Sequence, residues 1–277
     1  MLLGEDGKLV RFLRPDLLFA STTQSGCLYQ TPHTLQQHTS YEELASVVGC
    51  GMVADRMFFG RSNGHVTHGH LSTFGTLHEM QSLSPISDVL TAFDVSSYGN
   101  LLQTSQRSLE VSDCQGSPLL SHSFPFLIRS ANFFDEAASV GLIGNFFQIL
   151  DLRSGDTTAS APVAFVTRSA RVKNFQVALG TLGGQVVLFD LRNMDAPVDV
   201  AESHAGHAIS AICATERGYV LSGSVDGSIS MTDFARPELS AKRLISEDGG
   251  AVVSLTAAQG RCAYLTDLGS LYNSSIY

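Results

Sequence analysis

Short apolar runs separated by tight polar turns recur along the whole chain. Runs of roughly four to eight apolar or alternating residues, bounded by Gly, Asn, Asp and Ser, are typical of β-strands. Seven pairs of such runs form a strand–turn–strand pattern, and successive turns are 38 to 43 residues apart. The seven turns end near residues 26, 64, 107, 145, 184, 227 and 269.

The last residue of each turn indicates the backbone conformation there. Glycine or asparagine occupies six of the seven positions, and these residues favour the positive φ that tight hairpin turns require. Arg107 is the exception, so its hairpin rests on the strand pattern alone. We expect a positive φ at Gly26, Gly64, Asn145, Gly184, Gly227 and Gly269.

Another apolar run precedes each hairpin, as at 209–213 and 252–256. Each unit is therefore expected to be a small antiparallel sheet of three or four strands. A repeat of about 40 residues with four strands per unit is typical of a β-propeller blade, and radial packing of such sheets buries both of their faces. The sequence predicts an all-β, seven-bladed β-propeller that occupies residues 1–277 as a single domain, with little or no helix. The polar segment 32–44 is expected to be an inter-strand loop with at most one helical turn.

Composition narrows the functions to consider. The net charge is −9, which disfavours direct nucleic-acid binding because such proteins need a basic surface. The apolar runs are too short for a membrane helix and the N-terminus lacks the pattern of a secretory leader, so we expect neither membrane insertion nor secretion. The five scattered cysteines contain no CxxC pair, which favours reduced thiols in a nuclear or cytoplasmic protein.

The sixth unit resembles a WD repeat. Gly206-His207 is similar to the Gly-His start of such a repeat, and Thr232-Asp233 stands where its Trp-Asp pair would be. In that family a His, a strand Ser or Thr, the turn Asp and the Trp form a hydrogen-bonded tetrad. The chain has no Trp, so it is expected to be a divergent WD-repeat propeller. The resemblance implies a structural tetrad built from His207, Ser222 or Ser224, and Asp226, with Thr232 in place of the Trp.

The last three units also resemble the WD-repeat nucleoporins of the outer ring of the nuclear pore. The likeness lies in Asp190-Leu191-Arg192, Asp226-Gly227-Ser228 and the hairpin ending at Leu271-Tyr272. It implies an architectural subunit at the nuclear envelope. We therefore expect a non-catalytic protein–protein interaction scaffold, a monomeric propeller that binds other protein subunits of a larger complex.

Two Asp-x-Arg sites in adjacent units suggest an alternative function. Asp151-Leu152-Arg153 and Asp190-Leu191-Arg192 are similar to the docking signature of WD-repeat substrate receptors of cullin ligases. This implies a substrate receptor or adaptor of a ubiquitin-ligase or methyltransferase complex, with Arg153 and Arg192 as partner-binding residues. Otherwise each arginine pairs locally, with Asp156 or Asp195 as the nearest following carboxylate.

No motif points to catalysis. The chain lacks a Gly-x-Ser-x-Gly elbow, a phosphate-binding loop and a dinucleotide fingerprint, and an enzyme with a propeller active site is disfavoured. The densest polar cluster holds four histidines, but strand alternation separates the first from the next two, whereas a metal needs converging ligands. We expect no catalytic residue, metal or cofactor. The four are His65, His68, His70 and His78.

Three double-phenylalanine sites bear on packing. Neighbouring residues of a strand point to opposite faces, so the two members of each pair are expected to pack against the two neighbouring blades. An exposed member would instead mark a partner site. The pairs are Phe58-Phe59, Phe133-Phe134 and Phe146-Phe147.

The last unit raises a question about ring closure. The chain ends soon after the turn at Gly269, and Met1–Gly7 has a poor strand sequence, so we expect three strands in this unit. The strand at 270–276 is then an exposed edge that can accept a strand from a partner. Ser270, Leu271 and Tyr272 are candidate partner-binding residues. The alternative is that Met1–Leu3 caps this edge.

Overall fold

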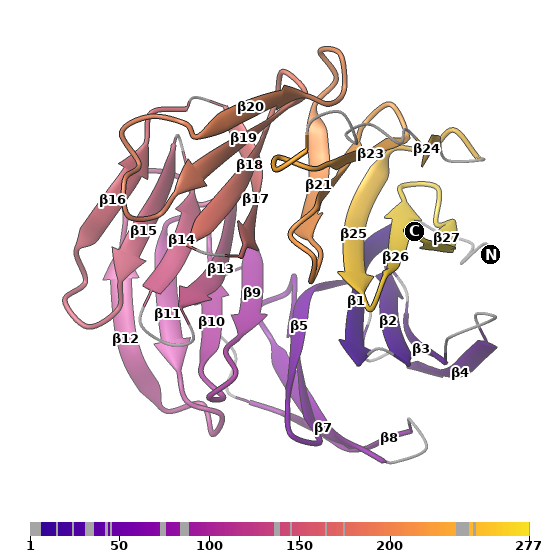
Figure 1. The fold of residues 1–277 in the computed structure, drawn as a ribbon. Helices are drawn as coiled ribbons and strands as arrows, with labels where there is room; N and C mark the ends of the chain where they lie inside the picture. Colours follow the sequence, from indigo (N-terminus) through magenta and orange to yellow (C-terminus); the bar gives the residue numbers. More distant parts are fainter. Residues whose placement is uncertain are drawn as a thin grey trace.

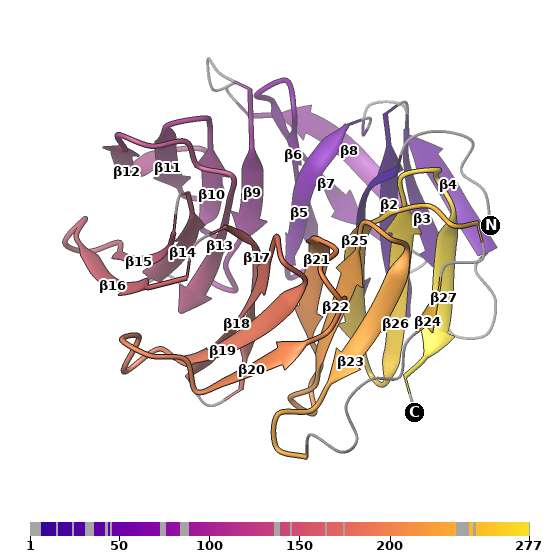
Figure 2. The same ribbon diagram turned by 90° about the horizontal axis from the view of Figure 1, so that it is seen from above.

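The computed structural model describes residues 7–14, 16–23, 25–30, 36–41, 44, 46–72, 76–83, 89–135, 139–144, 146–163, 165–173, 175–236, 244–245 and 248–276. Seven antiparallel sheets are arranged around a centre as the blades of a β-propeller (Figure 1, Figure 2). The predicted all-β fold and the number of blades are confirmed. Among the described residues, no helix is long and apolar enough to span a membrane.

Six blades have four strands in the described residues, ordered from the centre outward, and the seventh has three. The first four blades are β1 (Gly7–Arg14), β2 (Leu17–Thr22), β3 (Gly26–Gln30), β4 (Gln36–Tyr41); β5 (Val47–Val53), β6 (Arg56–Arg61), β7 (Val66–Leu71), β8 (Leu77–Ser82); β9 (Ala92–Val95), β10 (Leu101–Thr104), β11 (Ser108–Ser112), β12 (Pro118–Ser123); and β13 (Ser130–Asp135), β14 (Ser139–Ile143), β15 (Phe147–Asp151), β16 (Thr157–Ala161). The last three are β17 (Val166–Val172), β18 (Gln176–Thr181), β19 (Gln185–Asp190), β20 (Asp199–Glu202); β21 (Ile209–Ala214), β22 (Val220–Ser224), β23 (Ser228–Thr232), β24 (Leu244–Ile245); and β25 (Val252–Ala258), β26 (Arg261–Thr266), β27 (Leu271–Ser275).

The turn and loop predictions are corrected at two places. Positive φ occurs as predicted at Gly64, Gly184, Gly227 and Gly269, whereas Gly26 has no positive φ and is required for close packing, since a Cβ there would lie 2.6 Å from the Cβ of Leu44. Asn145 lies outside the described residues. Part of segment 32–44, predicted as a loop, forms strand β4, which pairs with β3.

Hydrophobic clusters fill the interfaces between blades. Phe59 packs with Phe19 between blades one and two, and Phe58 packs with Phe93 between blades two and three. This confirms the predicted opposite orientations of the first pair. Phe134 and Phe147 meet between blades four and five, with ring centroids 5.5 Å apart, and Phe133 packs on the other side of blade four. The prediction is wrong for Phe146, whose side chain is 48% exposed.

Glycines on second strands allow neighbouring blades to approach closely. A Cβ at Gly223 of β22 would lie 2.4 Å from Cγ1 of Val252, and a Cβ at Gly180 of β18 would lie 2.6 Å from Cγ2 of Ile209. Both apolar partners begin the first strand of the next blade. Gly60 of β6 approaches Phe93 of β9 in the same way, so glycines allow close blade spacing at these three interfaces.

The ring closes where β1 of blade one contacts β25 of blade seven. The last strand, β27, pairs with β26, and the ring of Tyr272 stacks on that of Tyr264 with centroids 4.7 Å apart. Ser270 and Leu271 are buried, so any partner contact by these residues would be through the backbone of the strand edge. Strand addition at 270–276 stays a prediction, and Met1–Leu3 lies outside the described residues.

Candidate functional site

The two flat ends of the propeller carry different loops. One end, which we call the turn face, holds the turns between second and third strands and the connections from one blade to the next. The opposite face holds the turns between first and second strands and the connections between third and fourth strands. This division follows from the antiparallel strand order in every blade. Ligands of such a ring meet one of these faces or the rim of outer strands.

Exposed apolar side chains gather on the turn face. Of the twelve exposed large hydrophobic residues in the described part of the chain, seven lie in its turns and connections. Turns normally favour Gly, Pro, Asn, Asp and Ser, so apolar side chains there have no role in forming the turn. Grouped exposed hydrophobics mark interaction surfaces. The seven are Val89, Leu127, Phe146, Phe165, Leu182, Val225 and Leu268.

Blade five holds the most developed part of this surface. A groove of about 680 Å³ runs along its outer strands, from Phe165 and Leu182 on the turn face to Pro197 in the connection between β19 and β20, and Pro162, Val163 and Val200 also line it. Phe165 is 67% exposed and has φ 59°, a left-handed conformation that costs a non-glycine residue about 1 kcal/mol or more. The N–H of Leu182 donates to the carbonyl of Phe165 at 3.0 Å, which fixes the two exposed side chains on one rigid support.

Ser222 and Asp226 of the predicted tetrad share a hydrogen-bonded network, but His204 and Ser228 link them, and the hydroxyl of Thr232 lies near that of Ser203 instead. His204 is buried, and its Nδ1 lies 2.8 Å from Oγ of Ser228, which donates to Oδ1 of Asp226 at 2.6 Å. Its Nε2 lies 2.9 Å from Oγ of Ser222. Because the Ser228 hydroxyl donates its hydrogen bond to the Asp226 carboxylate, Ser228 Oγ accepts from the Nδ1–H of His204.

His207, the residue predicted from the Gly-His string, is exposed. Its N–H donates to the carbonyl of His204 at 2.9 Å. His207 thus forms a turn in the connection between β20 and β21, while the side chain of His204 is buried in the blade. The Oγ of Ser224 accepts from the N–H of Asp226 at 3.3 Å and supports the turn. Ser228 was missed by the sequence analysis, although the Asp-Gly-Ser string contains it. The network stabilises blade six and presents no reactive group to solvent.

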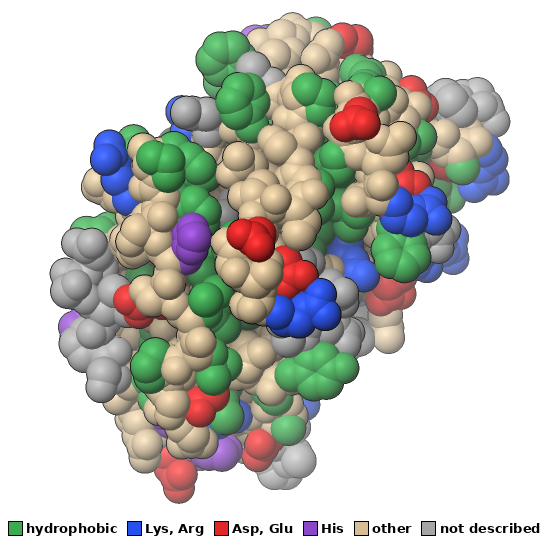
Figure 3. All heavy atoms as spheres, turned by 90° about the vertical axis from the view of Figure 1, so that its left-hand side faces the viewer, with side chains coloured by type: hydrophobic (Ala, Val, Ile, Leu, Met, Phe, Trp, Pro, Cys, Tyr) green, Lys and Arg blue, Asp and Glu red, His purple; other side chains and the backbone are tan. Residues whose placement is uncertain are grey.

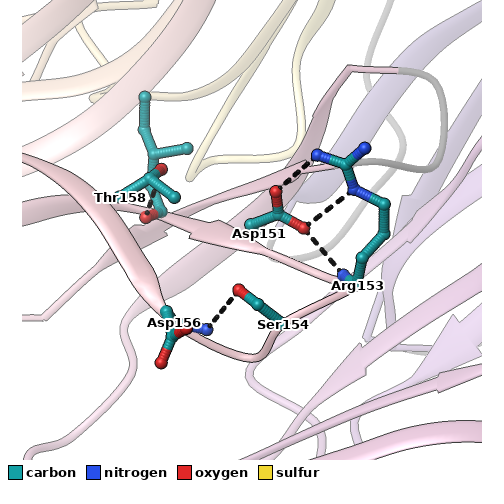
Figure 4. A network of polar contacts seen from close by, with 6 residues as sticks. Asp151, Arg153, Ser154, Asp156 and Thr158 are labelled. Carbon is teal, nitrogen blue, oxygen red and sulfur yellow. Dashed lines mark hydrogen bonds and ion pairs between the residues drawn. The ribbon is translucent and has the colours of Figure 1, made fainter.

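The opposite face carries the two Asp-x-Arg sites. Arg153 donates through Nε and Nη2 to the two carboxylate oxygens of Asp151, at 3.2 and 2.8 Å (Figure 4). Arg192 makes the same pair with Asp190, at 2.9 and 2.5 Å. Asp156 turns away from Arg153 in Figure 4, and its N–H donates to Ser154. The local partner of each arginine is thus the aspartate two residues before it, which corrects the expected pairing with Asp156 and Asp195.

These pairs change the titration of both aspartates. The arginine hydrogen bonds lower the pKa of Asp151 and that of Asp190 to about 2. Arg192 also lies over the ring of Phe175, 5.5 Å from its centroid. A third pair, Arg236 with Asp233 at 3.3 Å, occupies the same place in blade six. Its Asp-x-x-Arg spacing explains why a search for Asp-x-Arg missed it.

An ion pair joins blades across the centre of the ring. Arg11 of β1 bonds Asp94 of β9 at 3.1 Å and also donates to the carbonyl of Cys50. The other oxygen of Asp94 accepts from the N–H of Phe133 at 3.0 Å. This network links the first strands of blades one to four, which favours a structural role.

Among the described residues, the histidine cluster and the side of the rim formed by β12 and β16 (Figure 3) carry no comparable surface. Within the described residues, no group of three or more His, Cys, Asp or Glu is placed to hold a metal. His68 is buried against Phe58, and Arg56 lies 2.9 Å from its Nε2. On the side where β12 and β16 form the rim, hydrophobic side chains are scattered among polar ones (Figure 3). The turn face is therefore the strongest candidate site.

Comparisons with known proteins add no family assignment. A scan against protein-family models finds no match, and a search of curated proteins finds none either. The seven-bladed β-propeller follows from the structure itself, and the likeness to WD repeats rests on the residues of blade six.

Proposed function

We propose that this chain is a non-catalytic protein–protein interaction scaffold whose turn face binds a partner subunit. The observation that carries the proposal is the gathering of seven exposed hydrophobic side chains on one end of the ring. Their backbone is held by hydrogen bonds, such as Leu182 N–H to Phe165 and Val225 N–H to Ala208 at 3.1 Å. A rigid, pre-ordered surface loses little entropy on binding. The strained φ of Phe165 supports a function at this position.

The finer assignment is an architectural subunit of the outer ring of the nuclear pore, located at the nuclear envelope. It is supported by the likeness of the last three blades to the WD-repeat nucleoporins. The alternative is an adaptor or substrate receptor of a ubiquitin-ligase or methyltransferase complex. That alternative is supported by the exposed guanidiniums of Arg153 and Arg192 in adjacent blades. Both arginines already bind their own aspartates, which makes the turn face the better candidate.

Affinity isolation of the tagged chain from its own cells tests the proposal. We expect stoichiometric protein subunits to co-purify with the wild type and to be lost from a Leu182→Ser, Val225→Ser variant. Subunits of the pore would support the first assignment, and a cullin adaptor would support the second. A wild type without a stoichiometric partner, or a turn-face variant that retains every partner, would contradict the scaffold proposal.

Two further variants separate binding from folding. Phe165→Gly removes an exposed side chain and relieves the left-handed strain, so the free energy of unfolding should change by less than about 1 kcal/mol while partner recovery falls. Phe175→Ser is the matched control, because Phe175 is also exposed and has φ 63° but lies on the opposite face. It should leave partner recovery unchanged.

A further inference from the structure

Acidic and apolar side chains alternate on the turn face of blades five to seven. Each of these blades presents an exposed apolar residue in its turn: Leu182, Val225 and Leu268. Three carboxylates lie among them, one at the end of β20, one in the connection before β25 and one in the turn after β26. We call this surface the acidic crescent. It comprises Phe165, Leu182, Val225 and Leu268 with Glu202, Asp248 and Asp267.

The charge of the crescent is not cancelled locally by the contacts that the structure gives. Glu202 accepts from Nε2 of Gln185 at 2.5 Å. Asp248 accepts from Gly250 N–H at 3.0 Å and from Thr266 Oγ1 at 2.8 Å. All of these donors are uncharged, so they order the carboxylates without neutralising them.

Burial acts to raise the pKa of Asp248, but hydrogen bonds more than offset this, so its pKa is lowered. Basic groups are scarce nearby: the described segments 182–184, 203–208, 225–227, 248–250 and 267–269 contain no Lys or Arg. Among the described residues, the arginine closest in sequence to Phe165 is Arg168, near the start of β17, and its guanidinium donates to the carbonyl of Thr167 at 2.9 Å. The crescent therefore carries a net negative charge beside exposed hydrophobic groups.

We infer that the acidic crescent docks a segment of a partner protein in which Lys or Arg side chains alternate with large apolar ones. The groove at Phe165 and Leu182 takes an apolar anchor, and the carboxylates of Glu202, Asp248 and Asp267 face the basic side chains. Charge complementarity selects this occupant over an acidic one, since like charges across an interface are strongly unfavourable. This inference rests on the proposed scaffold function and names the chemistry of the partner.

Three short fluorescent peptides of the same length serve as probes: alternating Lys–Leu, alternating Glu–Leu and alternating Lys–Ser. Fluorescence anisotropy measures their binding to the full chain. We expect the Lys–Leu peptide to bind at least about tenfold more tightly than either of the others. Its affinity should fall as salt rises, because exposed charges are screened.

Two double variants test whether the peptide binds at the acidic crescent. Leu182→Ser with Val225→Ser should weaken Lys–Leu binding about tenfold, and Glu202→Gln with Asp267→Asn should weaken it about threefold. Phe175→Ser with Asp156→Asn is the matched control on the opposite face and should leave the affinity unchanged. Circular dichroism of each variant verifies that the fold is retained.

Equal affinity for the Glu–Leu peptide, no binding of the Lys–Leu peptide, or Lys–Leu binding that persists in both crescent variants would overturn the inference. The scaffold proposal would still hold if the variant with Leu182→Ser and Val225→Ser loses the native partner in the affinity isolation. If that variant also retains every native partner, the scaffold proposal fails as well. The two ideas are thus tested separately.

Discussion

The hydroxyl of Ser254 in blade seven binds both backbone polar groups of Val10 in blade one. It accepts from the N–H of Val10 at 3.0 Å and donates to its carbonyl at 3.3 Å. Val10 lies on the innermost strand β1, where every second N–H and C=O points away from the neighbouring strand β2. A side chain of the last blade therefore satisfies buried backbone groups of the first, and this contact is part of the ring closure.

Removing this hydroxyl should weaken the closure. Ser254→Ala leaves the two groups of Val10 without this partner, and we expect a loss of about 1–3 kcal/mol in the free energy of unfolding. Urea denaturation followed by circular dichroism measures the change. Ser121→Ala, at an exposed position of β12, is the control and should change stability by less than about 0.5 kcal/mol. Equal losses in both variants would show that the Ser254–Val10 contact does not stabilise the ring.

The glycines between blades give a second prediction. Gly223→Ala places a methyl group 2.4 Å from Val252 Cγ1, so blades six and seven must separate or repack, at a cost of about 1–3 kcal/mol. Gly183→Ala is the control, because the nearest atom to its Cβ, Oγ1 of Thr181, is 3.9 Å away. Thermal unfolding of both variants measures the difference. An unchanged midpoint for Gly223→Ala would contradict the close-packed interface.

Blade six should depend on His204 and hardly on His207. His204→Ala leaves the buried Ser222 and Ser228 hydroxyls without their imidazole partner, and we expect a loss of about 1–3 kcal/mol. His207→Ala should cost less than about 0.5 kcal/mol because that side chain is exposed. Asp226→Ala should resemble His204→Ala. Denaturation midpoints in urea decide between the two histidines, and a larger effect at His207 would reinstate it in the tetrad.

The Asp-x-Arg pairs predict a specific pH dependence. The folded pKa values of Asp151 and Asp190 lie near 2, below the value of about 3.9 expected in the unfolded chain. Their contribution to stability is therefore present above about pH 4 and is lost as the pH falls toward 2. In Arg153→Ala with Arg192→Ala, carboxyl NMR titration should show both pKa values rising toward the unfolded value.

The same double variant tests the docking alternative. We expect it to change stability slightly and to retain the native partners, because each arginine is held by its own aspartate. Partners lost from a folded double variant would support docking through Arg153 and Arg192. Unchanged titration of Asp151 and Asp190 would show that the arginines do not control these carboxylates.

The propeller could be predicted from the sequence because each blade contains a hairpin formed by residues close in sequence, and these hairpins recur at a regular spacing with glycine in most of their turns. Gly64, Gly184 and Gly227 have a positive φ in their turns, a conformation that favours glycine, so each of these glycines marks one blade in the sequence. Gly26 shows the limit of this reasoning. Gly26 occupies the expected position in the repeat, but its turn does not require glycine. Glycine is required there because a Cβ would clash with Leu44, and the local sequence pattern does not predict this contact.

The candidate site was harder to predict from the sequence than the fold. His204 and His207 lie on one connection, and only the path of the chain decides which enters the blade. Leu182, Val225 and Leu268 are isolated apolar residues in the sequence, separated by about forty positions, and the strand order shared by the blades brings them to one face. Apolar residues in three successive tight turns were the available signal, since turns usually carry polar residues.

Hydrogen–deuterium exchange of the chain, alone and within its native complex, tests the central claim most directly. It reports protection along the chain and does not require the partner to be identified beforehand. The account predicts slower exchange on complex formation at the turns 181–184, 224–227 and 266–269, with no change at the Asp-x-Arg turns 151–156 and 190–195. Protection confined to the Asp-x-Arg turns, or absent from all three turn-face segments, would contradict it.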